Sequence, residues 1–290
     1  MIEILTFFYH SDGMEYPKLL TTTLFDSLFL DSNIPALMKT DRVIHNIYCA
    51  PPDTQWIIEN YLPMAKEKGL EVFINNTIID SVSSPRCQLH LTIQDQIRKS
   101  INNKSVIIMA PPDMIFGNGL AGVINNLNVG EYLVCGHPRV SLEQGYEKIK
   151  EFLKTPKTNK EFMKLFVEEV PHFIVQEAKR FKHDYEYMEK NHYGWVMYFK
   201  EPPPVAFYGT EEILTEGYKN PYFGNFEVID HDLPNMFFKQ GKLKWIDDSD
   251  VFCWGEFTSD KAYTKMITND WWVESAKFFH TLPLRWRTND

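Results

Sequence analysis

The sequence predicts an α/β protein in which helices cover both faces of a mostly parallel central sheet. Two observations support this fold class. Short apolar runs alternate with amphipathic stretches through the first 140 residues, and Pro, Gly and Asn separate them. Such alternation is typical of βαβ units, in which a helix connects one strand to a parallel neighbour.

The expected elements of this first part follow in a regular order. Pro51 and Pro52 favour the start of a helix and Gly69 favours its end, because proline fits the first helical turn and glycine fits the position after the last. Strands are predicted at 3–8, 42–50, 71–74, 105–110 and 131–136. A helix is predicted within 22–38, where Asn33 and Pro35 close it, and further helices are predicted at 51–69, 88–101 and 119–127.

The amino-acid pattern changes after residue 141. Charged and aromatic helix is expected from 142 to about 193, followed by short strand candidates and a final aromatic helix at 270–279. The predicted organisation is therefore a first half over 1–141, a helical insertion over 142–195 and a mixed α+β half over 196–290. No stretch has the composition of a flexible linker, so we expect the three parts to pack as one unit.

Composition excludes some classes of protein. A net charge of −9 argues against a protein that coats nucleic acid by bulk electrostatics. Basic and aromatic residues do gather at 178–187 and 277–287, where either a local nucleic-acid groove or ordinary solvated helix faces would fit. We expect a soluble, cytoplasmic protein with no membrane partner, because apolar runs of membrane-spanning length and a signal peptide are not seen.

The four cysteines lie far apart. Cys49, Cys87, Cys135 and Cys253 form no CxxC pair, which favours reduced core thiols over disulfides or a zinc site.

One segment carries a functional pattern. In "SVIIMAPPDMIFGNG" (105–119) an apolar strand ends at two prolines and Asp113. Ligands of parallel sheets bind at the carboxyl ends of strands, and a carboxylate there suits a divalent cation that bridges nucleotide phosphates. The alternative is that Asp113 caps a short helix within 114–119.

Several motifs resemble the nucleotide-sugar-binding half of GT-A type glycosyltransferases, in particular a bacterial and phage group of that superfamily. The resemblance covers roughly 1–140 and, more weakly, 196–255. It rests on "TFFYHSDG" (6–13), "SLFLDSNIPAL" (27–37), "PRCQLHLTIQDQI" (85–97), "IIMAPPDMIFGNG" (107–119) and "YLVCGHPRVS" (132–141). It implies a GT-A-like, Rossmann-like fold.

The resemblance also implies donor-binding residues. The loop after the first strand would contact base and ribose through Phe8, Tyr9, His10 and Asp12. Asp113 falls on the last position of an Asp-x-Asp motif, which holds a metal and the sugar diphosphate. His280 falls where some of these enzymes carry a metal-binding histidine.

The chain departs from the motif at Pro111, which replaces the first carboxylate. Either a manganese or magnesium ion is held by Asp113, the diphosphate and a distant ligand, or cationic side chains neutralise the phosphates without a metal. Arg86 and Arg139 are the candidate cations, with surface ion pairs as the alternative. His137, beside Arg139, is a candidate for a hydrogen bond to sugar or phosphate, with a satisfied structural histidine as the alternative.

Two acidic clusters follow short strands in the second half, and we expect the catalytic base among them. Removing the proton of an acceptor hydroxyl calls for a nearby carboxylate. The candidates are Asp230, Asp232, Asp248 and Asp250. The alternative is that these acids cap helices and turns.

The function predicted from these features is glycosyl transfer. The donor would be a nucleoside-diphosphate sugar, UDP-sugar by family frequency, and the acceptor a hydroxyl on a glycan or on a hydroxymethylated base of phage DNA. The cell would be a bacterium or a phage-infected host. A metal-dependent phosphohydrolase and a non-catalytic nucleotide-binding module are the alternatives.

Overall fold

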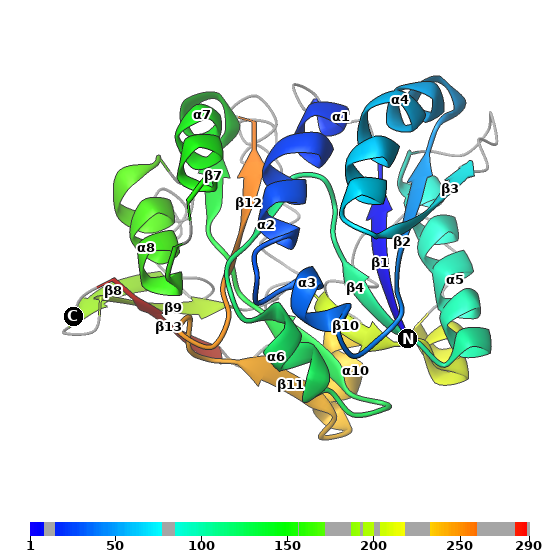
Figure 1. The fold of residues 1–290 in the computed structure, drawn as a ribbon. Coiled ribbons are helices and arrows are strands. Elements are labelled where there is room, and N and C mark those ends of the chain that lie inside the picture. The colour runs from blue at the N-terminus through cyan, green and yellow to red at the C-terminus, as the bar shows by residue number, and fades with distance from the viewer. Residues whose placement is uncertain are drawn as a thin grey trace.

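The computed structural model describes residues 1–8, 15–76, 85–155, 157–171, 187–191, 194–199, 204–217, 233–259 and 282–288. Their centre is a seven-stranded sheet with the order β11-β6-β10-β4-β1-β2-β3 (Figure 1). The strands are β1 (Ile2–Phe7), β2 (Val43–Cys49), β3 (Glu71–Asn76), β4 (Val106–Met109), β6 (Tyr132–Cys135), β10 (Pro204–Tyr208) and β11 (Leu243–Ile246).

All strands of this sheet except β10 run in one direction. The strand β10 is antiparallel to both of its neighbours, β4 and β6, while the other pairs are parallel. The expected fold class, a mostly parallel, Rossmann-like sheet flanked by helices, is confirmed. The predicted strand positions of the first 140 residues are also confirmed, with small shifts at their ends.

Helices cover both faces of the sheet because the strand residues alternate between two apolar cores. Ile2 and Ile4 of β1 belong to the larger core, whereas Leu5 and Phe7 belong to the smaller one. The larger core is covered by α1 (Tyr16–Leu19), η1 (Leu20–Leu24), α2 (Phe25–Leu28), α3 (Ile34–Leu37), α4 (Pro51–Glu67) and α6 (Leu120–Asn125). The smaller core is covered by α5 (Pro85–Asn103), η3 (Ile213–Gly217) and α10 (Leu233–Lys239).

Two smaller sheets flank the central one. One has the order β5-β12-β7, from β5 (Met114–Phe116), β7 (Arg139–Ser141) and β12 (Trp254–Thr258). The other has the order β13-β9-β8, from β8 (Tyr187–Asn191), β9 (Gly194–Phe199) and β13 (Leu282–Arg287). The residues after 195 thus contribute strands to every sheet.

The structure corrects three expectations about local structure. The first helix begins and ends earlier than expected, because helix runs over 16–28, and α3 begins separately after Asn33. The buried Asn33 side chain donates to the carbonyl oxygens of Ser27 and Gly117, so it fixes the end of one helix to a distant loop. Helix does not extend to 193, since α7 (Leu142–Phe152), α8 (Asn159–Lys164) and η2 (Leu165–Glu169) are followed by strand β8, which pairs with β9.

The third correction concerns the segment after Asp113. Residues 114–116 form strand β5, antiparallel to β12, so Asp113 does not cap a helix there.

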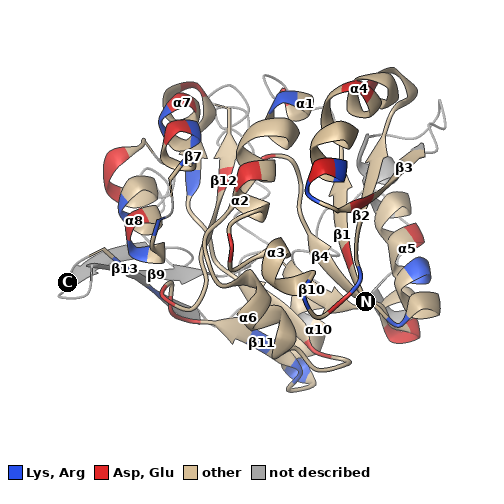
Figure 2. Cartoon of the chain, viewed as in Figure 1, with Lys and Arg blue, Asp and Glu red and all other residues tan. Residues whose placement is uncertain are grey.

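Charge is mixed over the outer helices. Figure 2 shows acidic and basic residues side by side on α7 and α8, and Lys150 and Lys154 pair with Glu147 and Glu151 one turn earlier. These pairs are ordinary features of a solvated helix face. None of the helices in the described ranges combines the length and the apolar character that crossing a membrane requires.

Gly119 is required where the loop after β5 meets the segment before β12. Its φ is +99°, and an added Cβ would lie 2.2 Å from the carbonyl oxygen of Val251. We therefore expect Gly119→Ala to lower the free energy of unfolding by on the order of 2 kcal/mol or more, measured by urea denaturation. In the control, Gly122→Ala on open helix surface in α6, stability should rise by about 0.5–1 kcal/mol. Equal effects of the two changes would contradict this account.

Candidate functional site

The parallel strands bring four predicted regions to one end of the central sheet. Phe8 follows β1, Asp113 follows β4, His137 follows β6 and Asp247 follows β11 directly. Neighbouring strands are about 4.8 Å apart, so β1 lies next to β4, β6 is about 10 Å from β4 and β11 is about 15 Å from β4. We call this the carboxyl end of the sheet. Tyr9, His10 and Asp12 lie outside the described residues.

A buried chain of hydrogen bonds fixes the turn that carries Asp113. The Thr6 hydroxyl donates to the carbonyl oxygen of Ala110 at 2.6 Å, and it lies 2.7 Å from Nε2 of His45. Since the single hydroxyl hydrogen is used on Ala110, Thr6 accepts from His45 Nε2–H, and His45 Nδ1 accepts from the Tyr61 hydroxyl at 2.6 Å. Burial lowers the pKa of His45 to about 3, which keeps the ring neutral. The chain connects α4 to the residue before the two prolines.

Asp113 itself is buried, with 3% of its surface exposed. Its carbonyl oxygen accepts a hydrogen bond from the Phe257 amide at 2.8 Å, so the turn is joined to β12. Asp113 therefore lies between β4 of the central sheet and β5 of the small sheet β5-β12-β7. Whether Asp113 shares a pocket with the loop Tyr9 to Asp12, as the resemblance implies, stays a prediction, because that loop lies outside the described residues.

Glu256 is the residue that sequence reasoning missed. It lies in the middle of β12, opposite Met114 on β5 and Arg139 on β7. Its Oε2 lies 2.7 Å from Nε2 of His137 and 3.7 Å from Nε of Arg139. A lone acid within the apolar strand "FCWGEFT" (252–258) was the available signal, because an uncompensated carboxylate is rarely placed in a strand interior.

The charge at this position is held by its two partners. Burial raises the pKa of the Glu256 carboxyl, but the positive charge of Arg139 and the hydrogen bond from His137 outweigh it and hold that pKa well below its usual range. The indole of Trp254 packs on the His137 ring, with centroids 5.0 Å apart, and donates to the Cys135 carbonyl oxygen at 2.9 Å. His137 is 4% exposed, whereas the Arg139 side chain is 29% exposed. Of the predicted donor-binding residues, Arg139 lies on β7, His137 lies two residues before it, and Asp113 directly precedes β5.

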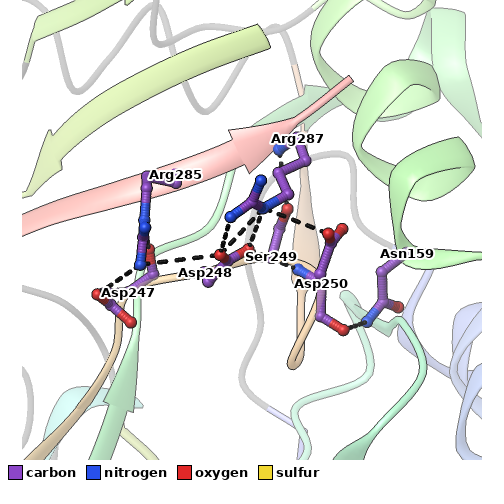
Figure 3. A network of polar contacts seen from close by, with 7 residues as sticks. All are labelled: Asn159, Asp247, Asp248, Ser249, Asp250, Arg285 and Arg287. Atoms are coloured by element: carbon purple, nitrogen blue, oxygen red, sulfur yellow. Dashed lines mark hydrogen bonds and ion pairs between the residues drawn. The ribbon is translucent and has the colours of Figure 1, made fainter. Parts of the chain in front are cut away.

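Asp248 and Asp250 belong to a second cluster, before the start of β12 (Figure 3). Arg287 of β13 contacts the carboxylates of both, at 2.6 Å for Asp248 and 3.2 Å for Asp250. Burial raises the pKa of Asp248, but the hydrogen bonds from Arg287 and the other lowering contributions outweigh this effect. The pKa of Asp248 therefore lies below its usual range. The Asp250 amide also donates to Asp248 Oδ1 at 3.0 Å, as in a turn stabilised by an aspartate. These contacts are those of the alternative interpretation, in which the acids hold a turn.

The other predicted site residues are not placed by the structure. Asp230, Asp232 and His280 lie outside the described residues, and Arg86 lies in α5 with a side chain outside them as well. Their roles stay predictions.

The described side chains do not form a metal site by themselves. Within the described ranges no three His, Cys, Asp or Glu side chains lie together as metal ligands would. Glu256 Oε2 is engaged by His137 and Arg139, which leaves Asp113 as the predicted oxygen ligand in this region. The predicted ligand His280 lies outside the described residues, so a divalent cation held by Asp113 and His280 stays a prediction.

Comparison with protein-family models and with curated protein sequences found no match. Among solved structures, one similar chain is a protein assigned as a glucose-1-phosphate thymidylyltransferase from Bacillus anthracis, in complex with a sucrose. The two chains share 12% identity over 96% of each, with a TM-score of 0.44. This similarity is too low to assign a function.

The Thr6 chain gives a test of how the Asp113 turn is held. We expect Thr6→Val, which keeps the side-chain shape, to lower the free energy of unfolding by about 1–3 kcal/mol, because it leaves the Ala110 carbonyl and His45 without a buried partner. Urea denaturation measures the change. The control is Thr21→Val, whose hydroxyl donates to Pro17 and Lys18 within its own helix, and it should cost less than about 0.5 kcal/mol. A Thr6→Val loss as small as the control would contradict the account.

The ion pairs of Glu256 predict a pH dependence. A carboxyl with a lowered folded pKa stabilises the protein above its unfolded pKa of about 4.3, and the contribution is lost as pH falls toward the folded value. The difference in unfolding free energy between the wild type and Glu256→Gln should be on the order of 1–3 kcal/mol and constant from about pH 5 to 8. It should shrink below about pH 4, measured by urea denaturation across pH. A difference that persists unchanged at pH 3 would count against the assignment.

Proposed function

We propose that the chain is a glycosyltransferase that binds a nucleoside-diphosphate sugar at the carboxyl end of its sheet. The observation that supports this most is that Glu256 of β12 contacts both His137 and Arg139, in a small sheet that Asp113 joins through its carbonyl oxygen. A cationic side chain suits a diphosphate and a carboxylate suits sugar hydroxyls. An aromatic ring suits a nucleotide base.

Arg139 is the proposed diphosphate ligand. Glu256 contacts its Nε side at 3.7 Å, which orients a planar guanidinium with five N–H donors. The side chain keeps about a third of its surface in solvent (29%), so a ligand can reach it. A bidentate fork to two phosphate oxygens is the contact that arginine makes and lysine cannot reproduce.

Asp113 is proposed to accept hydrogen bonds from hydroxyls of the donor, and Phe8 to support the base. Phe8 follows β1 directly, and its ring stacks on Tyr16 with centroids 6.2 Å apart. The resemblance implies a divalent cation. Among the described residues, Asp113 would be one of its ligands. UDP is the first nucleotide to test.

The ion pairs of β13 favour a glycan or other non-nucleic acceptor over DNA. Arg285 and Arg287 lie in the basic segment 277–287, and both pair with acids, Arg285 with Asp247 and Arg287 with Asp248 (Figure 3). Such paired arginines contribute little net positive charge to a phosphate backbone. The same pairs disfavour a phosphohydrolase built on this acidic cluster, because cations occupy the place of a metal.

A thermal-shift screen tests the proposal. UDP, GDP, CDP and dTDP, each with its common sugars and with or without Mn²⁺, are added to the full chain. A ligand at a hundred times its Kd adds about 2.7 kcal/mol to stability, a clear rise in Tm. Arg139→Lys should abolish most of this rise while its own Tm stays near that of the wild type, because the charge is kept and the fork is lost.

Arg42→Lys is the matched control, since Arg42 makes a two-pronged contact with Glu71 at the opposite end of the sheet. It should leave the ligand shift intact. If no nucleotide or nucleotide sugar raises Tm, the proposed function is wrong. If nucleotides bind but no sugar is released from any donor, the chain is the non-catalytic binding module.

A further inference from the structure

Strand β3 is an unprotected edge of the central sheet. It ends the strand order and pairs with β2 alone among the described strands, so its outer N–H and C=O groups face no described strand. Such an edge can pair with another chain, and proteins commonly protect it with lysine, proline or a bulge. The opposite edge, β11, carries Lys244. By contrast, β3 reads EVFINN, without lysine or proline, and its register with β2 runs without a bulge.

The centre of this edge is apolar and exposed. Phe73 has 46% of its surface exposed. The two faces of β3 differ, because Val72 and Ile74 pack on the larger core beside α4, whereas Phe73 points to the other face. On that other face α5 packs most closely on β1, β4 and β10, farther into the sheet. The Phe73 ring therefore lies over an edge strand that α5 does not cover.

Opposite charges flank Phe73 on the same face. Glu71 and Asn75 are the next residues on this face, because the side chains of a strand alternate. Lys99 of α5 donates to Asn75 Oδ1 at 2.9 Å, so one end of β3 carries a positive charge and the other carries the Glu71 carboxylate. The side chains of Glu71 and Lys99 stay 42% and 36% exposed, although each also pairs with an opposite charge of its own chain.

We propose that β3 binds a second copy of this chain, with the two β3 strands antiparallel about a two-fold axis at Phe73. In that register Phe73 lies opposite the partner's Phe73, and Glu71 lies opposite the partner's Asn75, beside the partner's Lys99. The strand is thus complementary to itself in charge, and the two Phe73 rings cover each other. A parallel pairing would instead bring the two Glu71 carboxylates together.

This surface is separate from the candidate donor site. Four strands, β2, β1, β4 and β10, lie between β3 and β6, which puts β3 about 24 Å from β6. The inference therefore goes beyond the proposed function and does not depend on it.

Analytical ultracentrifugation of the full chain without nucleotide tests the pairing. Between about 1 and about 200 μM we expect a shift from monomer to dimer, as for a small interface. Phe73→Lys should raise the Kd of the dimer at least about tenfold, because it places two positive charges opposite each other. Its Tm should stay near that of the wild type, because Phe73 is exposed.

Phe238→Lys is the matched control. Phe238 is 45% exposed and lies on α10, which packs on β6 and β11 toward the opposite edge of the sheet. The same substitution there should leave the Kd of the dimer unchanged.

Oxidation of cysteine variants tests the register. Directly opposite residues of an antiparallel pair have Cα atoms about 4.5–5.5 Å apart, within the range that a disulfide allows. With dioxygen as the oxidant and copper phenanthroline as the catalyst, Phe73→Cys should form a disulfide-linked dimer. Glu71→Cys and Asn75→Cys should each cross-link little alone and should cross-link with each other when mixed. The wild type, treated in the same way, gives the background of the native thiols.

Several results would overturn the inference. One is a monomer throughout the concentration range, and another is a dimer that Phe73→Lys leaves intact. Cross-linking of Glu71→Cys or Asn75→Cys alone, without cross-linking of Phe73→Cys, would contradict the antiparallel register. Protection of the β3 amides from hydrogen exchange in a monomer would show that another segment of this chain covers the edge.

Discussion

Glu256 is the group on which the candidate site depends, because its carboxylate is shared by His137 and Arg139. His137 and Glu256 are 119 residues apart in the chain, and strand β12 brings them together by inserting between β5 and β7. The same strand joins the Asp113 turn through the Phe257 amide. Without β12 the ends of β4 and β6 would be separated by β10, about 10 Å apart, with no element to complete a site.

Much of the first half could be predicted from local sequence. Runs such as 105–110 are apolar on both faces, and Pro and Gly mark their ends, so strand positions follow from composition alone. The placement of Phe8 and Asp113 at one end also follows, because parallel strands finish at the same end of a sheet. Asn33 was expected to close the first helix, but its hydrogen bond to Gly117 of a distant loop could not be predicted from the local sequence.

The candidate site could be predicted only in part, for a physical reason. A carboxylate on a strand gains its role from partners on neighbouring strands, and the pairing of β12 with β7 is not visible in the segment around Glu256. The acidic cluster at 247–250 shows the opposite case, because its position in the sequence suggested chemistry, while Arg285 pairs with Asp247 and Arg287 with Asp248 in the fold (Figure 3). The segment of strand β8 was predicted to be helix, because only its pairing with β9 identifies it as a strand.

The central claim, that the β5-β12-β7 sheet forms the donor site, is tested most directly by a crystal structure of the full chain with UDP or another nucleotide that binds it. The account predicts diphosphate oxygens within hydrogen-bond distance of the Arg139 guanidinium. A nucleotide bound beside Asp248 and Asp250, or at the opposite end of the sheet near Arg42, would contradict it.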